Sequence, residues 1–327
     1  SLLVTGTSPT AEAARQELRR GLSGLLGRAP VDVATPRNGT VLVGTPASSP
    51  LIASLGPKLD RLGPEGYLLR SARVGGRRLT IVAANGDAGL LYGAFALLRH
   101  LQTGGRLDGL DMAEAPARPL RMLNHWDNLD RTVERGYAGF SLWDWHKLPH
   151  WVDPRITDYG RANASIGINA TVLTNVNANA EVLTPAYLAK VAALADRLRP
   201  WRIRVYLTDR FSAPMEIGGL KTADPLDPAV QRWWQAKAAK IYRAVPDFGG
   251  FLVKANSEGQ PGPQDYGRSH AEGANMLAEA LGPHGGRVIW RAFVYAARKG
   301  EDRARQAFDE FRPLHGKFRP NVMLQVK

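Results

Sequence analysis

From about residue 116 onward the sequence alternates short β-rich runs with helical stretches, and no other feature constrains the fold as strongly. The β-rich runs are PLRMLNHW, INATVLTNV, RIRVYLTDR, GGFLVKA, RVIWRAFVY and NVMLQVK. The helical stretches between them include TPAYLAKVAALADRLRPW, DPAVQRWWQAKAAKIYRAV, SHAEGANMLAEAL and DRARQAFDEFRPL. Strands joined through helices pair in parallel, so the pattern predicts an α/β fold with a parallel sheet, typically a (β/α) barrel.

An open doubly wound sheet is the alternative to a barrel. Such sheets often bind a nucleotide through a glycine-rich loop after a strand, but GTPASSP and GTSPTA match neither the dinucleotide nor the P-loop pattern. A closed TIM-type barrel needs eight strands, whereas six β-rich runs are present. We therefore expect residues 116–327 to form about strands one to six of a (β/α)8 catalytic barrel that is incomplete in this chain.

The first 115 residues have a different pattern and predict a separate small N-terminal α/β domain. TAEAARQELRRGLSGLLG has apolar residues at helical spacing, and DAGLLYGAFALLRHLQ reads as a buried helix. GYLLRSARVGGRRLTIVAAN predicts two strands about a Gly-Gly turn. The following TGGRLDGLDMAEAPARP has no periodicity, which places the domain boundary near Pro116, between residues 1–115 and 116–327.

Composition excludes several classes of protein. The chain has no cysteine, so disulfides, thiolate metal sites and a cysteine nucleophile are excluded, and its seven histidines are not paired at metal-ligand spacing. We expect neither a metal nor another cofactor. The net charge is +13, but the basic residues are scattered, which favours an anionic small ligand over nucleic acid. No apolar run reaches the roughly 18 residues of a membrane span, so we expect no membrane partner; the compartment stays open, with the cytoplasm and the periplasm favoured.

Polar residues collect where the predicted strands end. The strand-end segments are NHWDN, TNVNAN, LTDRFS, KANSEG, WRAFVY and QVK. Asparagine amides and indole faces suit a carbohydrate, because hydroxyls need paired donors and acceptors while the C–H face of a sugar packs on an aromatic ring. Lys254, Arg291 and Lys327 add positive charge at three strand ends, which suits a carboxylate on the ligand.

Glu258 is the candidate catalytic acid. Glycoside hydrolysis needs a protonated carboxylic acid beside the leaving oxygen and a second carboxylate as base or nucleophile. Glu258 follows a predicted strand directly and has few acidic neighbours. The available second carboxylates are Asp127, Asp209, Glu216 and Asp265; we expect Asp127 and Asp209 to hold loops or bind hydroxyls, and Asp265 to lie in a turn.

Three long segments resemble the xylan α-1,2-glucuronidases of glycoside hydrolase family 67, and the resemblance runs through the whole chain. They are RMLNHWDNLDRTVERGYAGFSLWDW (121–145), VKANSEGQPGPQDYGRSHAEGANMLA (253–278) and VIWRAFVY (288–295). The resemblance implies a hydrolase of xylan degradation that releases glucuronic acid, or its 4-O-methyl ether, from the terminal xylose of xylooligosaccharides. Inversion of configuration and independence of metal are implied as well.

Site roles follow from the same resemblance. Glu258 is similar to the family's general acid, and Lys254, Arg291 and Lys327 to the basic residues that hold the uronate. Trp126 resembles an indole that lines the sugar site, and Val176 a wall residue near the methyl ether. Arg131 and Thr132 depart from the family's pattern, and we expect them to be a surface variation.

The resemblance also implies what lies beyond Lys327. In the family, the carboxylates that activate water and a helical C-terminal domain that forms a homodimer come later in the chain. We therefore expect residues 1–327 alone to be inactive, with the catalytic base outside them. The rival hypotheses are a non-catalytic protein that binds uronic-acid oligosaccharides and a basic protein that associates with nucleic acid.

Overall fold

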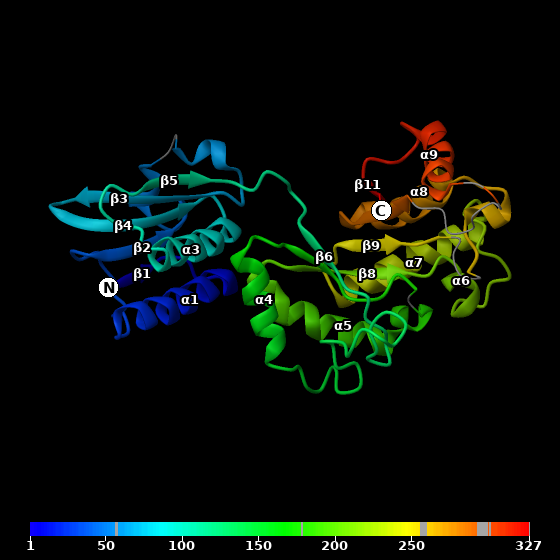
Figure 1. Cartoon of the computed structure of the whole chain (residues 1–327), viewed down its shortest axis with the longest axis horizontal. Helices are drawn as coiled ribbons and strands as arrows, with labels where there is room; N and C mark the ends of the chain where they lie inside the picture. The colour runs from blue at the N-terminus through cyan, green and yellow to red at the C-terminus, as the bar shows by residue number, and fades with distance from the viewer. Residues whose placement is uncertain (56–57, 178, 256–259, 293–299, 301, 327) are drawn as a thin grey trace. The chain divides into compact units, whose positions relative to one another are not determined.

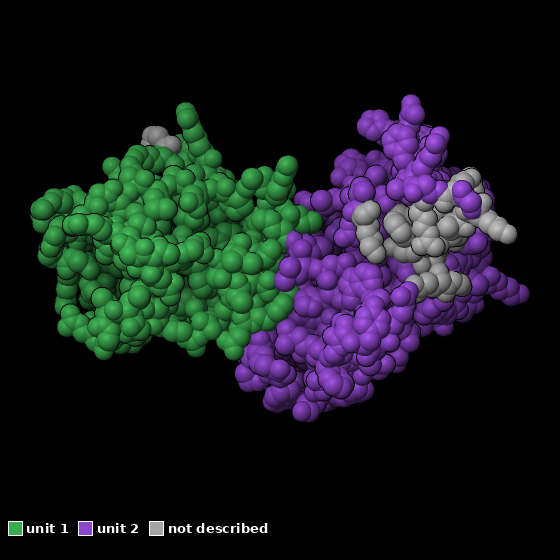
Figure 2. Space-filling model, in the orientation of Figure 1, with its two compact units in different colours: residues 1–121, 157–169, 198–203 green, residues 122–156, 170–197, 204–327 purple. Residues whose placement is uncertain are grey.

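The computed structural model describes residues 1–55, 58–177, 179–255, 260–292, 300 and 302–326. Two of the predicted site residues, Glu258 and Lys327, lie outside the described residues. The chain forms two compact units (Figure 2). Unit 1 consists of residues 1–121, 157–169 and 198–203, and unit 2 of residues 122–156, 170–197 and 204–327.

Unit 1 contains a five-stranded mixed sheet (Figure 1). Its strands lie in the order β1 (Leu2–Val4), β2 (Thr40–Gly44), β4 (Arg77–Ala84), β3 (Tyr67–Val74) and β5 (Asp111–Glu114). β1, β2 and β4 are parallel, while β3 runs antiparallel to both β4 and β5. The predicted hairpin is confirmed: Gly75 and Gly76 join β3 to β4 with φ of 55° and 79°, which the tight turn needs and glycine adopts without strain.

Strand β5 lies in the stretch that the sequence marked as irregular. Its residues DMAE are mostly exposed, so the sequence has no alternation of apolar and polar residues that would predict a strand. The segment pairs with β3 through the backbone, from Tyr67↔Glu114 to Arg70↔Asp111. An edge strand of this kind is set by its neighbour rather than by its own propensity.

Two long helices cover one face of this sheet, as predicted (Figure 1). They are α1 (Pro9–Leu26) and α3 (Asp87–Gln102). Ser8 Oγ caps α1 by accepting a hydrogen bond from the Ala11 N–H at 3.1 Å. The helices approach closely at Gly21, where an added Cβ would clash with the side chain of Leu98.

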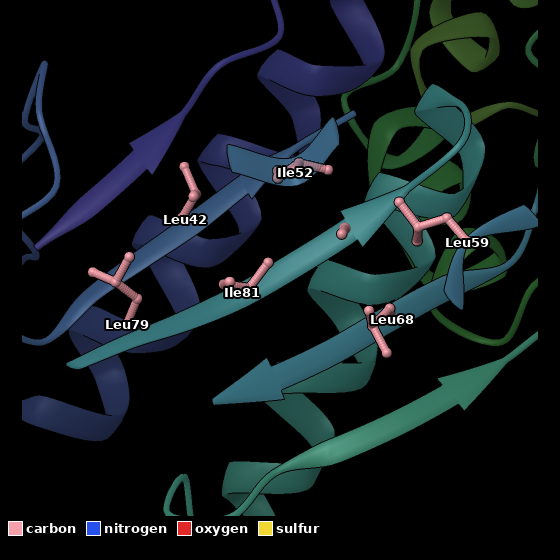
Figure 3. Packing of buried hydrophobic residues seen from close by; sticks show 7 residues of the cluster. Leu42, Ile52, Leu59, Leu68, Leu79 and Ile81 are labelled. Atoms are coloured by element: carbon pink, nitrogen blue, oxygen red, sulfur yellow. The ribbon is translucent and has the colours of Figure 1, made fainter. Parts of the chain in front are cut away.

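The opposite face of the sheet carries a second apolar layer (Figure 3). The short helix α2 (Pro50–Ala53) contributes Ile52 to it. The other buried members are Leu42, Leu59, Leu68, Leu79, Ile81 and Ala83. Burial on both faces explains why β2 and β4 read as continuous apolar runs.

Helix α4 (Arg155–Ser165) and the 3-10 turn η4 (Arg199–Trp201) belong largely to unit 1. Arg161 forms a two-point ion pair with Glu17 of α1, with Nε–Oε1 at 2.5 Å and Nη2–Oε2 at 2.9 Å. Gly160 lies against the Trp201 ring, where a Cβ would come within 2.6 Å of an indole carbon. Unit 1 is therefore built from three separate parts of the sequence.

Unit 2 contains a six-stranded parallel sheet, which confirms the predicted α/β class with a parallel sheet. The strands are β6 (Met122–Asn124), β7 (Ala170–Val172), β8 (Arg204–Asp209), β9 (Gly250–Val253), β10 (Arg287–Ala292) and β11 (Val322–Val326). They pair in the order of the sequence from β6 to β11. A doubly wound sheet reverses its strand order at a switch point, and these six described strands contain no reversal.

Helices connect the strands of this sheet. They are α5 (Pro185–Leu198), α6 (Ala213–Glu216), α7 (Pro228–Ala244), α8 (His270–Leu281) and α9 (Arg303–Phe311). Trp234 of α7 packs edge-on against Phe251 of β9, and His270 of α8 packs in the same way against Trp290 of β10. Phe251 and Trp290 therefore point toward the helices, and their strand neighbours Leu252 and Arg291 point to the opposite face.

Candidate active site

Strand register places three basic residues side by side at the carboxyl ends of β8, β9 and β10. Asp209 of β8 pairs with Val253 of β9, and Val253 pairs with Trp290 of β10. The next residue along the chain is Arg210 after β8, Lys254 after β9 and Arg291 within β10. If the alternation continues past the strand ends, these three share one level and the face away from the helices. We call them the cationic row. The amide of Gln325 on β11 continues the level, because it pairs with Arg291.

A contact across the sheet shows that it is strongly curled. The Arg291 guanidinium carbon lies 5.8 Å from the centroid of the Trp126 ring, which follows β6. Four strand spacings of about 4.8 Å separate β10 from β6, or about 19 Å in a flat sheet. The face that carries the cationic row is therefore concave, and Trp126 and Arg291 meet across it.

Lys254 contacts the loop that carries Val176, at the same end of the sheet. Lys254 Nζ donates a hydrogen bond to Asn177 Oδ1, in the loop after β7. Val176, the residue before Asn177, is buried. Lys254 is 8% and Arg291 is 5% exposed, so both cations are largely removed from water. The structure thus places Trp126, Val176, Lys254 and Arg291, the predicted site residues that it describes, at the same end of the sheet.

The loop after β6 is fixed by backbone and amide hydrogen bonds. The Glu134 N–H donates to the Trp126 carbonyl at 2.8 Å, and the Glu134 carbonyl accepts from Asn128 Nδ2 at 2.8 Å and from Asn175 Nδ2 at 3.2 Å. The Asn175 N–H in turn donates to the Asp127 carbonyl at 2.8 Å. These bonds tie the loop after β6 to the loop after β7, beside Trp126.

Arg131 and Thr132 are not a mere surface variation, so that expectation is wrong. Arg131 adopts a φ of 74° and pairs through Nη1 with the buried carboxylate of Asp144 at 3.0 Å. Thr132 Oγ1 accepts from Asn128 Nδ2 at 2.9 Å. Both residues are half-buried and stabilise the loop that follows Trp126.

Arg210 is the member of the cationic row that the sequence analysis missed. Its Nε donates to Gln260 Oε1 at 2.9 Å and lies 3.1 Å from Glu216 Oε1. Ser212 Oγ donates to the same two side chains. The LTDRFS segment was recognised as a strand end, but alternation along β8 was needed to see that Arg210 and not Asp209 shares the face of Lys254.

Asp209 points the other way. It is 1% exposed, and neither carboxylate oxygen accepts a hydrogen bond from another described residue. Burial raises the pKa of this carboxyl well above its ordinary value, and its own backbone N–H offsets only part of the effect. The expectation that Asp209 holds a loop or binds a hydroxyl is therefore wrong.

The remaining carboxylates near the strand ends have structural partners. The Asp127 carboxylate lies 3.4 Å from His125 Nδ1, and the Asp127 backbone carbonyl accepts a hydrogen bond from the loop after β7. Asp265 accepts from the Gly262 N–H at 2.7 Å in the 3-10 turn η5 (Pro263–Tyr266), which confirms its place in a turn. Within the described ranges no three His, Asp or Glu side chains converge as metal ligands would, and no helix is long and apolar enough to cross a bilayer.

Curated relatives cover nearly the whole chain. Probable alpha-glucuronidase A of Neosartorya fischeri is 40% identical over 321 residues, which are 96% of this chain and 38% of the relative. Probable alpha-glucuronidase A of Aspergillus fumigatus is 39% identical over 330 residues, 99% of this chain and 39% of the relative. Alpha-glucuronidase of Hypocrea jecorina is 40% identical, over 96% of this chain and 38% of the relative. The chain thus spans about two fifths of the length of these relatives.

Solved structures share the fold at low sequence identity. A GH138 enzyme targeting pectin rhamnogalacturonan II has a TM-score of 0.64 at 16% identity, and the match covers 99% of this chain and 38% of that enzyme's chain. CpGH84B has a TM-score of 0.56 at 11% identity, over 94% of this chain and 50% of its own. Residues 1–97 match the N-terminal domain of glycosyl hydrolase family 67, and residues 100–327 match its middle domain. On these matches, the chain belongs to glycoside hydrolase family 67.

Proposed function

We propose that the protein is an inverting α-glucuronidase that releases glucuronic acid, or its 4-O-methyl ether, from the terminal xylose of xylooligosaccharides. The observation that carries the proposal is the concave face on which Lys254 and Arg291 lie at one level, with Trp126 against the Arg291 guanidinium. Membership of family 67 and the names of the curated relatives support it. The substrate partner is thus an aldouronic acid.

Two buried cations on adjacent strands favour an anionic ligand. Unit charges about 5 Å apart repel by about 3 kcal/mol at an effective dielectric constant near 20, and a carboxylate between them replaces this repulsion with attraction. Arg291 offers a planar fork of donors and Lys254 a compact charge, which together suit a uronate carboxylate. We propose Lys327 as the third cation, since it follows β11 in the sequence.

Trp126 and Val176 are proposed as the apolar part of the sugar site. The indole of Trp126 is half-buried, and its ring offers a face on which the C–H groups of a pyranose pack. Val176 is held between Asn175 and Asn177, which are joined by an Asn177 N–H to Asn175 Oδ1 bond of 2.9 Å. A fixed apolar wall of this kind suits a methyl ether.

Glu258 is proposed as the general acid that protonates the leaving xylose oxygen. Among the described carboxylates near the strand ends we assign no catalytic base. Asp209 is buried and its pKa is raised, and Glu216 is paired with Arg210. We further propose that the curled sheet is part of a (β/α)8 barrel, that the domain boundary lies between residues 115 and 116, and that the complete protein is a homodimer.

The activity is tested by following an aldouronic acid by proton NMR during hydrolysis. Release of glucuronic acid as the β anomer before mutarotation is the expected result, since inversion of an α linkage produces it. Release of the α anomer first would contradict inversion, and binding without release would favour the non-catalytic alternative.

The role of Glu258 is tested by leaving-group dependence in Glu258→Ala. Turnover of a xylosyl substrate should fall by roughly 10²- to 10⁴-fold or more, because its poor leaving group needs protonation. An aryl glucuronide with an activated leaving group should lose far less. Equal losses on both substrates would assign Glu258 a structural role instead.

A further inference from the structure

His270 lies directly behind the cationic row, on the helix side of β10. It is the first residue of α8 and is 6% exposed. Its ring stacks on Phe311 of α9, with centroids 4.4 Å apart, and packs edge-on against Trp290, the residue before Arg291. Trp290 Nε1 donates a hydrogen bond to His270 Nδ1 at 3.1 Å.

This bond determines the tautomer of His270. An indole N–H is only a donor, so Nδ1 must accept and carry no hydrogen. In the neutral ring the hydrogen then lies on Nε2. Nε2 faces the amide nitrogen of Gln264 at 2.6 Å, while the Gln264 amide oxygen is buried and accepts no hydrogen bond from the part of the chain that the structure describes.

The amide of Gln264 is therefore assigned the opposite orientation. Two N–H donors do not bond to each other, and amide orientation follows from the surrounding hydrogen bonds. With the oxygen toward His270, Gln264 accepts from Nε2–H, and no donor faces another donor. The result is a directed chain from Trp290 of β10 through His270 to Gln264 of η5.

We propose that neutral His270 is a positioning residue that links β10 to η5. β10 carries Arg291, and η5 follows the Glu258 segment in the sequence. Protonation of His270 breaks this link and lowers activity. The inference rests on the proposed function. Successive side chains of a strand point to opposite faces. Because the bond to His270 holds Trp290 on the helix side, the next side chain, Arg291, is directed onto the concave face. Gln264 bonds to the same imidazole ring and so holds η5 in place.

Protonation breaks the chain because imidazolium has no acceptor. Its Nδ1–H would face the Trp290 N–H, and one of the two would have to move. Burial lowers the pKa of His270, while Glu310 of α9, at 3.4 Å from Nε2, favours the charged form and offsets part of this effect. The other described side chains that contact the ring, those of Gln264, Trp290 and Phe311, are neutral. Gln306 Nε2 donates to the second Glu310 oxygen at 3.0 Å.

The test combines pH profiles with the indole resonance of Trp290 in nitrogen-15 NMR. Two variants separate the functions of the ring: His270→Phe keeps the packing but accepts nothing, and His270→Asn keeps an acceptor near Nδ1 that does not titrate. His284→Phe is the matched control, since His284 is exposed and stacks on Tyr242 at 4.5 Å before the other end of β10. Trp290→Phe assigns the resonance.

In the wild type, the Trp290 indole resonance should shift as pH falls below 6.5, and kcat/KM for an aldouronic acid should fall with the same midpoint. His270→Phe should lower kcat/KM roughly tenfold at pH 7, with kcat reduced and KM raised, because small displacements of catalytic groups are costly. His270→Asn should restore most of that loss and abolish the shared midpoint, and His284→Phe should match the wild type.

The proposal would be overturned if His270→Phe had the same kcat/KM and pH profile as the wild type. It would also be overturned if the Trp290 indole resonance stayed constant while His270 titrates. Failure of the proposed function looks different, because the wild type would then release no glucuronic acid at any pH. In that case calorimetric binding of glucuronate to His270→Phe decides the positioning role: weaker binding than wild type supports it, and unchanged binding overturns it.

Discussion

The two faces of the parallel sheet, compared at the carboxyl ends of β8, β9 and β10, treat polar groups in opposite ways. On the concave face, Arg210 and Lys254 donate to side chains of neighbouring loops, and Arg291 lies over Trp126. One residue earlier, on the helix face, no other residue within the described ranges donates a hydrogen bond to either carboxylate oxygen of Asp209. Buried charged groups thus occur on both faces. On the concave face they contact polar and aromatic side chains that could also contact a ligand.

The position of a residue in the alternation along a strand predicts the face it occupies better than its residue type does. Asp209 and Arg210 are neighbours in the same LTDRFS segment, yet alternation sends them to opposite faces. The helix face should therefore govern stability and the concave face ligand binding, and substitutions on each can test that division.

The largest expected effect on stability is that of Phe251→Ala on the helix face. Phe251 is fully buried against Trp234 and Phe248, with ring centroids 5.8 Å and 5.5 Å away. Truncation should lower the free energy of unfolding by about 3–5 kcal/mol, measured by urea denaturation. Phe308→Ala, at an exposed position, is the control and should change it by less than about 0.5 kcal/mol. Glucuronate affinity of folded Phe251→Ala should stay near wild type; a large loss would break the division between faces.

Asp209→Val should raise stability, and the gain should depend on pH. The folded-state pKa of Asp209 lies above its unfolded value, so the folded protein holds the proton more tightly and the free energy of unfolding falls as pH rises between the two values. Removing the buried acid should therefore stabilise the protein by about 2 kcal/mol at pH 8 and by less at pH 4. Thermal melts at both pH values measure it. A gain that is the same at both, or a loss at pH 8, would show that Asp209 is not a neutral buried acid.

The smallest expected effect concerns the pair within the cationic row. Arg210 and Glu216 are partly exposed, so their coupling should be about 0.5–1 kcal/mol in a double-mutant cycle with Arg210→Ala and Glu216→Ala. Glucuronate binding should fall less than threefold in Arg210→Ala, because the Arg210 guanidinium already bonds to Gln260 and pairs with Glu216. A loss as large as that of Arg291→Ala would add Arg210 to the uronate site.

Much of the fold was predictable because its signals are local. Helices α1, α3, α5, α7, α8 and α9 and the six parallel strands coincide with apolar periods and β-rich runs. β5 was not predictable, because its DMAE residues pair only through the backbone. Nor was the assignment of residues 157–169 and 198–203 to unit 1, since it depends on long-range contacts such as Arg161 with Glu17.

The sequence was enough to predict which strand ends carry the candidate site, but not which of its side chains contact one another. Sequence proximity to a strand end pointed to Trp126, Lys254 and Arg291, and the structure brings these three together. The contact of Arg291 with Trp126 spans four strand spacings and depends on the curl of the sheet, which no local pattern encodes. The burial of the Asp209 carboxylate and the tautomer of His270 likewise depend on residues that lie far apart in the sequence.

In the proposed site, a uronate carboxylate binds the concave face through Arg291, and calorimetry with glucuronic acid and its neutral amide tests this claim. Arg291→Ala should weaken glucuronic acid binding by about 2 kcal/mol, or roughly thirtyfold, and leave binding of the amide nearly unchanged. Arg287→Ala, at the exposed start of the same strand, should bind both ligands as the wild type does. Unchanged glucuronic acid affinity in Arg291→Ala, or an equal loss for acid and amide, would contradict the claim.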